Sequence, residues 1–324
     1  MALLFDLLVI LFALAGLAAI GLAALLAAPL KVPPPLGSVL DGALQIDPEG
    51  LPELDRFQAR DGTWLAYRRY PAPHGAGNRI ALLAHGSAGA SAQMNAIARG
   101  LCNAGIGAVA VDFRGHGASG TRGDAAYAGQ HDDDFADLIA ELRARDPEAE
   151  LAFVGHSSGG GYGLRVAAGP LGAAFERFVL LAPYLGHRAP TVRITDAAKG
   201  WASANVPRII AILALARLGI DWPQALPVLA FATGPNSKKF VTDQYTFRLM
   251  ASYAAPDDWK AAFGKARAPI EVISGADDEL MDSAAFARVL SPLGVRVTLI
   301  PGVDHMGLCW RQEAIKAIVA ALNA

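Results

Sequence analysis

The sequence contains little of what several classes of protein require. Only two cysteines, Cys102 and Cys309, occur in 324 residues, and they lie far apart, which excludes a disulfide framework and a cysteine-based metal site. We expect both to be small, buried hydrophobic side chains. The chain also lacks an excess of charge, because 28 lysines and arginines stand against 30 aspartates and glutamates. No nucleic-acid partner is therefore expected.

Charge is missing altogether from one long run near the N-terminus. Hydrophobic residues make up 53% of the chain, the mean hydropathy is +0.32, and much of this excess lies in residues 7–30. As a helix rising about 1.5 Å per residue, the run is long enough to cross a hydrocarbon core about 30 Å thick. We interpret residues 7–30 as a membrane anchor.

Two other interpretations of the run stay open. A cleaved signal peptide needs a basic start, a shorter apolar core and small residues before the cut. Here no lysine or arginine precedes the run, and Pro29 follows the best small pair, Ala27-Ala28. The third interpretation is a buried helix of a soluble protein. Lys31, the first cation, follows the run, which favours the cytoplasmic side for the rest of the chain.

The pattern after the anchor (residues 1–31) predicts a linker and an α/β domain. Residues 32–53 contain three consecutive prolines, which suit a stiff tether. From residue 54, buried-type strands alternate with helical patterns, as in a parallel, doubly wound sheet covered on both faces. An Asp61-Gly62 turn predicts a hairpin at its start. The strand candidates are 80–84, 108–111, 151–154, 178–181, 270–273 and 295–300, and the helical candidates are 92–104, 133–145, 158–168, 283–290 and 312–322.

One interval breaks this alternation. Residues 184–266 contain the apolar segments 208–216 and 227–231 between two late strands. We expect a helical cap here, inserted between a first part of the core at 54–183 and a second part at 267–324.

A nucleophile motif stands between a strand and a helix. Gly155-His156-Ser157-Ser158-Gly159 follows the apolar residues 151–154 and precedes a stretch of small residues. G-x-S-x-G in this context is a nucleophile elbow, a sharp turn that lifts one serine hydroxyl above the sheet edge. The glycines are needed because the serine backbone is strained and a flanking Cβ would collide with the strand and helix. We expect Ser157 to be a nucleophile.

An acid and a histidine follow the later strands. A serine nucleophile needs a base, and the base needs an orienting acid. Strand 270–273 leads to Asp277 and Asp278, and strand 295–300 leads to His305. Side chains at the carboxyl ends of parallel strands collect at one sheet edge. The order serine, acid, histidine is that of the α/β-hydrolase fold, with either aspartate as the acid.

Five segments carry a resemblance to a known group. The chain resembles α/β hydrolases of the lysophospholipase, monoacylglycerol lipase and serine aminopeptidase-like group. The resemblance implies Asp278 as the acid, with Asp277 a solvated neighbour, and the N–H of Ser87 as an oxyanion donor beside that of Ser158. The matching segments are His85-Gly86-Ser87-Ala88-Gly89, residues 112–120, the elbow, Gly275-x-x-Asp278 and the His305 loop.

Other polar residues are interpreted more plainly. We expect Tyr184 and His187 to line the mouth of the pocket. His116 and His156 are expected to support the structure, and Asp304 to point away from its neighbour. The run 131–134, His-Asp-Asp-Asp, is explained by the dipole at a helix start, so no metal is expected. No motif for a cofactor is present.

These observations predict a serine hydrolase that cleaves carboxylic esters through an acyl-enzyme intermediate. An apolar cap beside a membrane anchor favours a lipid-like ester with an apolar acyl chain, such as a lysophospholipid or a monoacylglycerol. The alternative is a serine aminopeptidase or amidase, which needs carboxylates for the substrate amine; the candidates in the cap are Asp221, Asp243, Asp257 and Asp258. A second alternative is a non-catalytic, membrane-tethered binding protein on the same fold.

Overall fold

An eight-stranded, mostly parallel sheet forms the centre of the computed structural model, which describes residues 1–37, 50–73, 77–193, 200–233 and 241–324. The strand order is β1-β2-β4-β3-β5-β6-β10-β11. Only the pairs made by β2 are antiparallel, and the other neighbours run parallel. The strands are β1 (Leu54–Gln58), β2 (Trp64–Tyr70), β3 (Arg79–Ala84), β4 (Gly107–Asp112), β5 (Glu150–His156), β6 (Phe175–Leu181), β10 (Ile270–Gly275) and β11 (Arg296–Ile300).

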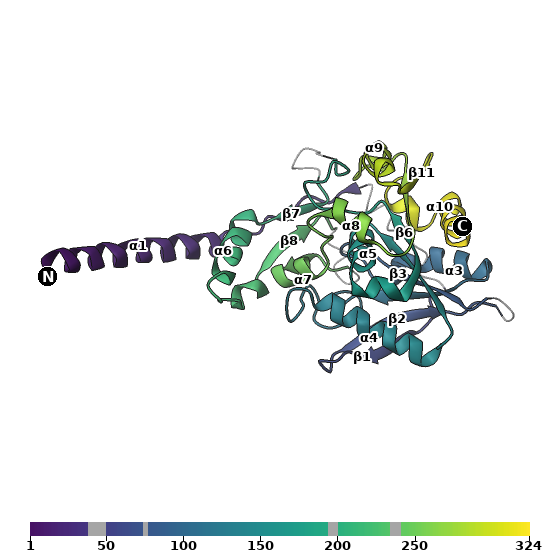
Figure 1. Ribbon diagram of the computed structural model, residues 1–324, viewed down its shortest axis with the longest axis horizontal. Helices are drawn as coiled ribbons and strands as arrows, with labels where there is room; N and C mark the ends of the chain where they lie inside the picture. Colours follow the sequence, from purple (N-terminus) through teal and green to yellow (C-terminus); the bar gives the residue numbers. More distant parts are fainter. Residues whose placement is uncertain (38–49, 74–76, 194–199, 234–240) are drawn as a thin grey trace.

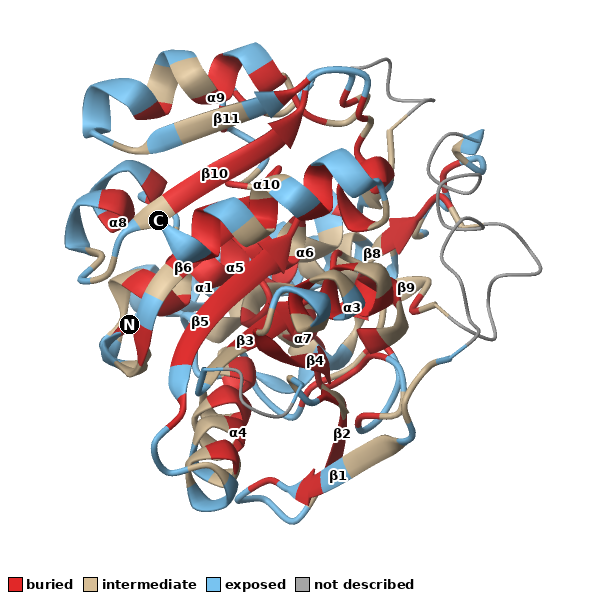
Figure 2. Ribbon diagram, turned by 90° about the vertical axis from the view of Figure 1, so that its right-hand side faces the viewer, coloured by how far each residue is buried: buried red, intermediate tan, exposed pale blue. Residues whose placement is uncertain are grey.

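Helices cover the central strands, as Figure 2 shows by the burial of the sheet. β4 is buried at every residue, which requires cover on both of its faces. Among the covering helices, α3 packs against α10 and α5 packs against α8. The helices that pack around the sheet are α3 (Asn95–Asn103), α4 (Gln130–Arg145), α5 (Ser158–Ala168), α9 (Ser283–Leu290), α10 (Gln312–Asn323) and, at the end of the insertion between β6 and β10, α8 (Trp259–Lys265). Short 3-10 helices are η1 (Ser91–Met94), η2 (Pro170–Ala174), η4 (Trp222–Ala225), η6 (Ser291–Leu293) and η7 (Met306–Cys309).

The predicted elements of the core are confirmed, with small shifts at their ends. All six strand candidates form strands, and the hairpin joins β1 to β2 with Gln58 opposite Trp64. Gly62 in its turn has a φ of +84°, a conformation that glycine adopts without strain. The helix predicted at 92–104 is divided, because η1 precedes α3. Local periodicity was thus sufficient to locate the elements that carry the site.

The insertion between β6 and β10 is not purely helical, and the prediction of a helical cap is wrong in this respect. It contains α6 (Val206–Ala216) and α7 (Phe247–Ser252), and also an antiparallel sheet of β7 (Ala202–Ala204), β8 (Pro227–Phe231) and β9 (Gln244–Thr246). The segment 227–231 pairs with β7 through Ser203 and Ala230. Five residues that include valine, leucine and phenylalanine are too few for a stable helix and suit a short strand.

The N-terminal helix α1 (Ala2–Ala27) extends away from the rest of the chain (Figure 1). None of its residues is buried. By length and composition it can cross a membrane or serve as a signal sequence. It is the one such helix among the described residues.

Candidate active site

Ser157 lies in a strained turn between β5 and α5. Its φ is +53°, and the other described non-glycine residues with positive φ are Ala88, in the loop after β3, and Ala182, directly after β6. Such strain persists only where the surroundings impose it. A Cβ on Gly159 would lie 2.4 Å from the carbonyl oxygen of His85, so only glycine fits there. The turn is further fixed because the Ser157 N–H donates to the Leu181 oxygen at 2.8 Å.

Asp278 and His305 meet at the carboxyl ends of the adjacent strands β10 and β11. Asp278 Oδ2 accepts a hydrogen bond from His305 Nδ1 at 2.8 Å, and both side chains are buried. The other oxygen of Asp278, Oδ1, accepts the N–H groups of Leu280 and Met281 at 2.9 and 2.7 Å. Asp277 is exposed. The structure therefore pairs His305 with Asp278 and leaves Asp277 in solvent.

The ionisation of this pair is set by two opposing effects. Burial alone would lower the pKa of His305, but attraction to Asp278 and the hydrogen bond between them raise the pKa above its usual value. Burial would likewise raise the pKa of Asp278, yet His305 and the two backbone N–H groups lower it. Asp278 is thus held as a carboxylate. With Nδ1–H donating to it, the Nε2 atom of neutral His305 is left as a proton acceptor.

His156 connects the elbow to the histidine loop. Its Nε2 lies 3.1 Å from the His305 carbonyl oxygen, and the two rings are 4.6 Å apart between centroids. Its Nδ1 lies 2.9 Å from Gln93 Nε2. Burial, followed by the charge of His305, lowers the pKa of His156 to about 3, so its ring is neutral. With the Gln93 amide donating to Nδ1, His156 donates from Nε2 and binds the His305 backbone to the elbow.

The loop after β3 lies directly against the elbow. A Cβ on Gly86 would lie 3.4 Å from the Ser157 Cβ. Among the residues that the structure describes, the N–H groups of Ser87 and Ser158 have no acceptor. For Ser158 the reason is its place in the first turn of α5, where N–H groups lack an intrahelical partner. Both N–H groups are available to an oxyanion next to Ser157.

Side chains from outside the motifs hold this loop, and the sequence analysis missed them. Gln93 Oε1 accepts the Gly86 N–H at 3.2 Å. Tyr245 Oη, from β9, accepts the Ala88 N–H at 2.8 Å. Trp201 Nε1 donates to Ser87 Oγ at 2.9 Å. Because these contacts span up to 157 positions of sequence, no local pattern signals them.

The two candidates for the pocket mouth differ in position. Tyr184 is half-buried, and its N–H donates to the Ser157 carbonyl oxygen at 2.9 Å, which places its backbone at the elbow. Burial raises the pKa of its hydroxyl, so Tyr184 is a neutral side chain. His187 is exposed, three residues further along the chain.

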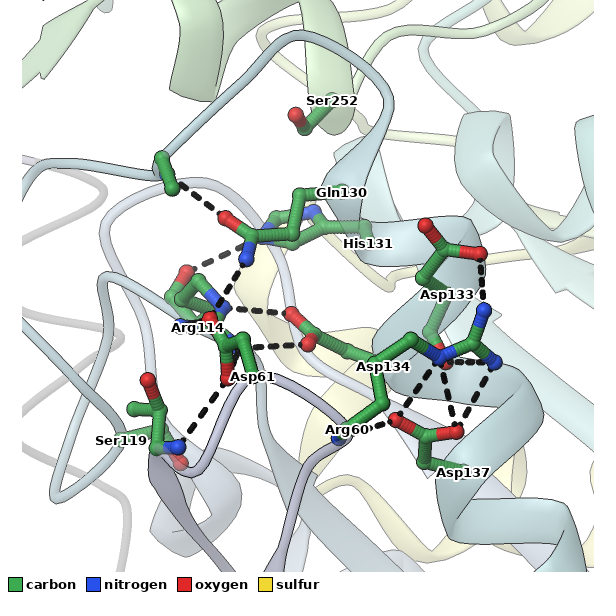
Figure 3. A network of polar contacts seen from close by, with 12 residues as sticks. Arg60, Asp61, Arg114, Ser119, Gln130, His131, Asp133, Asp134, Asp137 and Ser252 are labelled. Atoms are coloured by element: carbon green, nitrogen blue, oxygen red, sulfur yellow. Dashed lines mark hydrogen bonds and ion pairs between the residues drawn. The ribbon is translucent and has the colours of Figure 1, made fainter.

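The acidic run 131–134 is neutralised by arginines, as Figure 3 shows for two of its members. Asp134 binds Arg114 at 2.7 Å and Asp133 binds Arg60 at 2.6 Å. Outside the figure's labelled residues, Asp132 binds Arg165 at 2.8 Å. His116, the other histidine set aside from catalysis, is buried, and its Nε2 lies 2.6 Å from Tyr245 Oη. Asp304 binds the Gly307 N–H at 2.6 Å through Oδ1.

Comparison with known proteins shows the family and the fold of the chain. The family described as serine aminopeptidase, S33, matches residues 76–309. A soluble variant of monoglyceride lipase from Saccharomyces cerevisiae, solved with a substrate analogue, is 19% identical with a TM-score of 0.63; the match covers 85% of this chain and 94% of that one. The monoacylglycerol lipase of Paleococcus ferrophilus is 21% identical with a TM-score of 0.56, over 79% and 97% of the two chains.

A third solved structure matches nearly the whole chain. It is a bacterial membrane phospholipase A, described as a virulence factor, with 20% identity and a TM-score of 0.58 over 99% of this chain and 97% of that one. At these identities the likeness shows a shared fold. A search of curated proteins by sequence gives no match.

Proposed function

This chain belongs to the serine aminopeptidase (S33) family of α/β hydrolases, and on that premise we propose that it is a serine hydrolase of carboxylic esters with apolar acyl chains. The observation that carries the proposal is the buried pair of Asp278 and His305, joined at 2.8 Å, at the same sheet edge as the strained Ser157. A carboxylate-oriented histidine beside an elbow serine is the arrangement needed for nucleophilic attack on an acyl carbon.

The reaction proceeds through an acyl-enzyme. Ser157 Oγ forms a bond to the ester carbonyl carbon, and its proton passes to His305 Nε2. Asp278 stabilises the resulting imidazolium, while the N–H groups of Ser87 and Ser158 bind the oxyanion. The C–O bond to the alcohol then breaks, and the alcohol leaves with the proton from His305. Water, deprotonated by His305, attacks the acyl-enzyme in the same way and releases the acid.

Aromatic side chains of the cap favour an apolar acyl chain. Trp201 reaches Ser87 through its Nε1, and its ring lies 5.6 Å from that of Phe231, which in turn lies 4.6 Å from Tyr245. These rings border the oxyanion loop with apolar surface. The solved neighbours that act on monoacylglycerols and phospholipids support the same substrate class.

The alternative of an aminopeptidase needs carboxylates that face the site. Two of the candidates are engaged elsewhere: Asp258 Oδ1 accepts the Ala261 N–H at 3.0 Å, and Asp221 Oδ1 accepts from Gln224 at 2.7 Å. Both aspartates are exposed. We therefore favour an ester substrate over an amide substrate, although the family name refers to aminopeptidases.

A fluorophosphonate probe tests the nucleophile. We expect the full-length chain in detergent to form one covalent adduct, located at Ser157 by peptide mass spectrometry, and Ser157→Ala with an unchanged circular dichroism spectrum to form none. A folded protein that is not labelled would favour a non-catalytic binding protein. A panel of p-nitrophenyl esters from acetyl to dodecanoyl, beside aminoacyl anilides, then tests the substrate class. Faster cleavage of the anilides, or of acetyl than of all longer esters, would contradict it.

The proposal includes α1 as an uncleaved membrane anchor with the hydrolase domain on the cytoplasmic side. Its support is an apolar helix of 26 residues without a buried residue, followed by Lys31. We expect the protein to stay in membranes through an alkaline carbonate wash and to keep its N-terminus by intact-mass analysis. Loss of residues up to about position 28 would indicate a signal peptide. A reporter fused after Ala324 reads the side.

A further inference from the structure

The cap helix α6 is apolar on two faces, and the described part of the chain packs against only one of them. Ala211 and Ile212 are buried, and Ile212 packs with Val228 and Phe247 in a small core of the cap. The opposite stripe is exposed although it is equally apolar. With the turn that follows it, this stripe forms an apolar ridge of Val206, Ile210, Leu213, Leu218, Ile220 and Trp222. A continuous exposed apolar surface marks a site of contact with a membrane, a ligand or another protein.

The end of α1 is fastened to the same helix. Arg208, on α6, donates from Nε to the Leu26 carbonyl oxygen at 2.8 Å and from Nη2 to that of Ala28 at 2.6 Å. Asn205 donates to the Ala28 oxygen at 2.8 Å. The side chain of Leu26 packs against the small core of the cap. The carbonyl groups that a helix end leaves without partners are thus bound by the cap, and α1 and α6 form one unit (Figure 1).

The length of α1 defines where a membrane surface would lie. Residues 2–21 are all exposed, and partial burial begins at Leu22. These 20 residues span about 30 Å as a helix, which equals the thickness of a hydrocarbon core. The last turn of α1, where α6 is attached, then lies at the boundary with the headgroups. If Asp6 instead lies at the opposite boundary of the bilayer, the residues inside the hydrocarbon core shift by about one turn toward the C-terminal end of α1. In that case α6 lies no farther from the hydrocarbon core.

From these contacts we propose that the apolar ridge of α6 lies in the interface of a phospholipid bilayer. The proposal rests on the proposed role of α1 as an anchor. The bilayer is the occupant because α1 enters it and ends in bonds to α6, which leaves the ridge beside the lipid. An exposed tryptophan, Trp222, and a cation at the end of the stripe, Arg217, are the residue types that favour the headgroup level. Trp201, which reaches Ser87, precedes α6 by only a few residues, so the cap would receive substrate from the lipid.

Quenching by brominated phosphatidylcholine tests the position of the ridge. The full-length chain is reconstituted in vesicles whose lipids carry bromine at a shallow or a deep acyl position. Interfacial helices sit about 5–10 Å into the boundary, so we expect shallow bromines to quench Trp222 more than deep ones, and aqueous iodide not to reach it. The contribution of Trp222 is the difference between the native chain and Trp222→Phe, a mild change at a side chain 69% exposed.

Trp64 provides the matched control. It is also exposed, at 54%, but it begins β2, and that strand lies in the body of the molecule away from α1 (Figure 1). We expect Trp64→Phe to show the same bromine quenching as the native chain. Arg208→Gln, which removes the bonds to the end of α1, is expected to reduce quenching of Trp222.

The outcomes separate the ridge from the anchor. If the chain floats with the vesicles but iodide quenches Trp222 and bromine does not, the ridge faces water and the inference is overturned while the anchor stands. If neither reagent reaches Trp222, the ridge packs against a second copy of the chain, which also overturns it. A chain that does not float with vesicles contradicts the anchor itself.

Discussion

The catalytic roles proposed for Asp278 and His305 depend on each other because the two buried side chains form one pair. Asp278 Oδ1 is already bound by two backbone N–H groups, so only Oδ2 is left to bind the imidazole of His305. We expect Asp278→Asn to lower kcat by about 10⁴, because an asparagine amide favours the wrong tautomer of His305. Hydrolysis of p-nitrophenyl butyrate measures the loss.

Asp277 is the matched control for that substitution. It is adjacent in sequence but exposed, so Asp277→Asn should keep kcat within a few-fold of the native value. Equal losses in the two variants, or a loss only in Asp277→Asn, would show that the acid has been assigned to the wrong residue.

The pH dependence of activity should report the raised pKa of His305. His305 acts as a base only when it is neutral, so kcat/KM falls as pH drops through its pKa in the free enzyme. Since Asp278 raises that pKa, the acidic limb of the profile is expected above pH 6.5. The substrate should be a soluble ester that dissociates faster than it reacts, so that the profile reports the pKa of the free enzyme. An acidic limb well below pH 6.5 with such an ester would contradict the direction of the shift.

Individual residues differ in how far the sequence could identify them. Ser157, Asp278 and His305 follow strands that local periodicity locates, and parallel strands bring their carboxyl ends together. Gln93 and Tyr245 bind the loop after β3 from segments with no distinctive local pattern. Their positions depend on how the cap and η1 pack against the loop after β3. No short segment of the sequence predicts this packing.

At the scale of elements, a buried ion pair joins the loop after β4 to α4 (Figure 3). Arg114 binds Asp134 through two hydrogen bonds of 2.7 Å, with side chains 6% and 8% exposed. Removal of the arginine leaves a buried carboxylate without its partner. We expect Arg114→Met to reduce the free energy of unfolding by about 3–5 kcal/mol, measured by denaturation in urea.

Arg60, in the β1–β2 turn, gives the comparison on the same helix. It also binds aspartates of α4, but its side chain is 51% exposed, and solvent screens such pairs. Arg60→Met should therefore change the urea midpoint much less than Arg114→Met. If the two variants lose equal stability, the burial of the pair is not what stabilises this junction.

The core elements were predictable and the cap was not, for a physical reason. Strands such as β4 and β5 are buried on both faces and appear in the sequence as continuous apolar runs. In the cap, the equally apolar segments α6 and β8 form a helix and a strand, and composition alone does not separate them. The length of a segment and its pairing partners determine whether it forms a helix or a strand. β8 is a strand because it pairs with β7 on one side and β9 on the other.

At the scale of the whole molecule, the excess of apolar residues has three destinations. One is the core around the sheet, another is α1, and the third is the ridge of α6. Soluble domains bury most of such residues, and here two of the three destinations are exposed. α1 and the ridge of α6 lie at the same end of the molecule (Figure 1).

The interior of the hydrolase domain also holds several neutral histidines, and these should make it sensitive to acid. Burial is the main cause that lowers the pKa of both His131 and His156 to about 3. It also lowers that of His85 and His116. The unfolded chain takes up protons near pH 6.5 while the folded one does not, so stability is complete above pH 6.5 and falls as pH drops toward 3. The raised pKa of His305 has the opposite effect on stability, because the folded chain binds that proton more tightly than the unfolded one.

His131 allows this acid sensitivity to be measured for a single group. Between pH 7.5 and 5.5 we expect His131 and His156 together to account for a loss of about 3 kcal/mol, or about 1.4 kcal/mol each. His131→Phe keeps a ring beside Phe113 and Tyr253, whose centroids lie 5.3 and 5.2 Å away, but cannot be protonated. Loss of the bond from His131 to the Arg114 oxygen lowers stability equally at both pH values. Urea denaturation at the two pH values should therefore show a smaller difference for the variant, and an unchanged difference would mean that His131 is protonated in the folded protein.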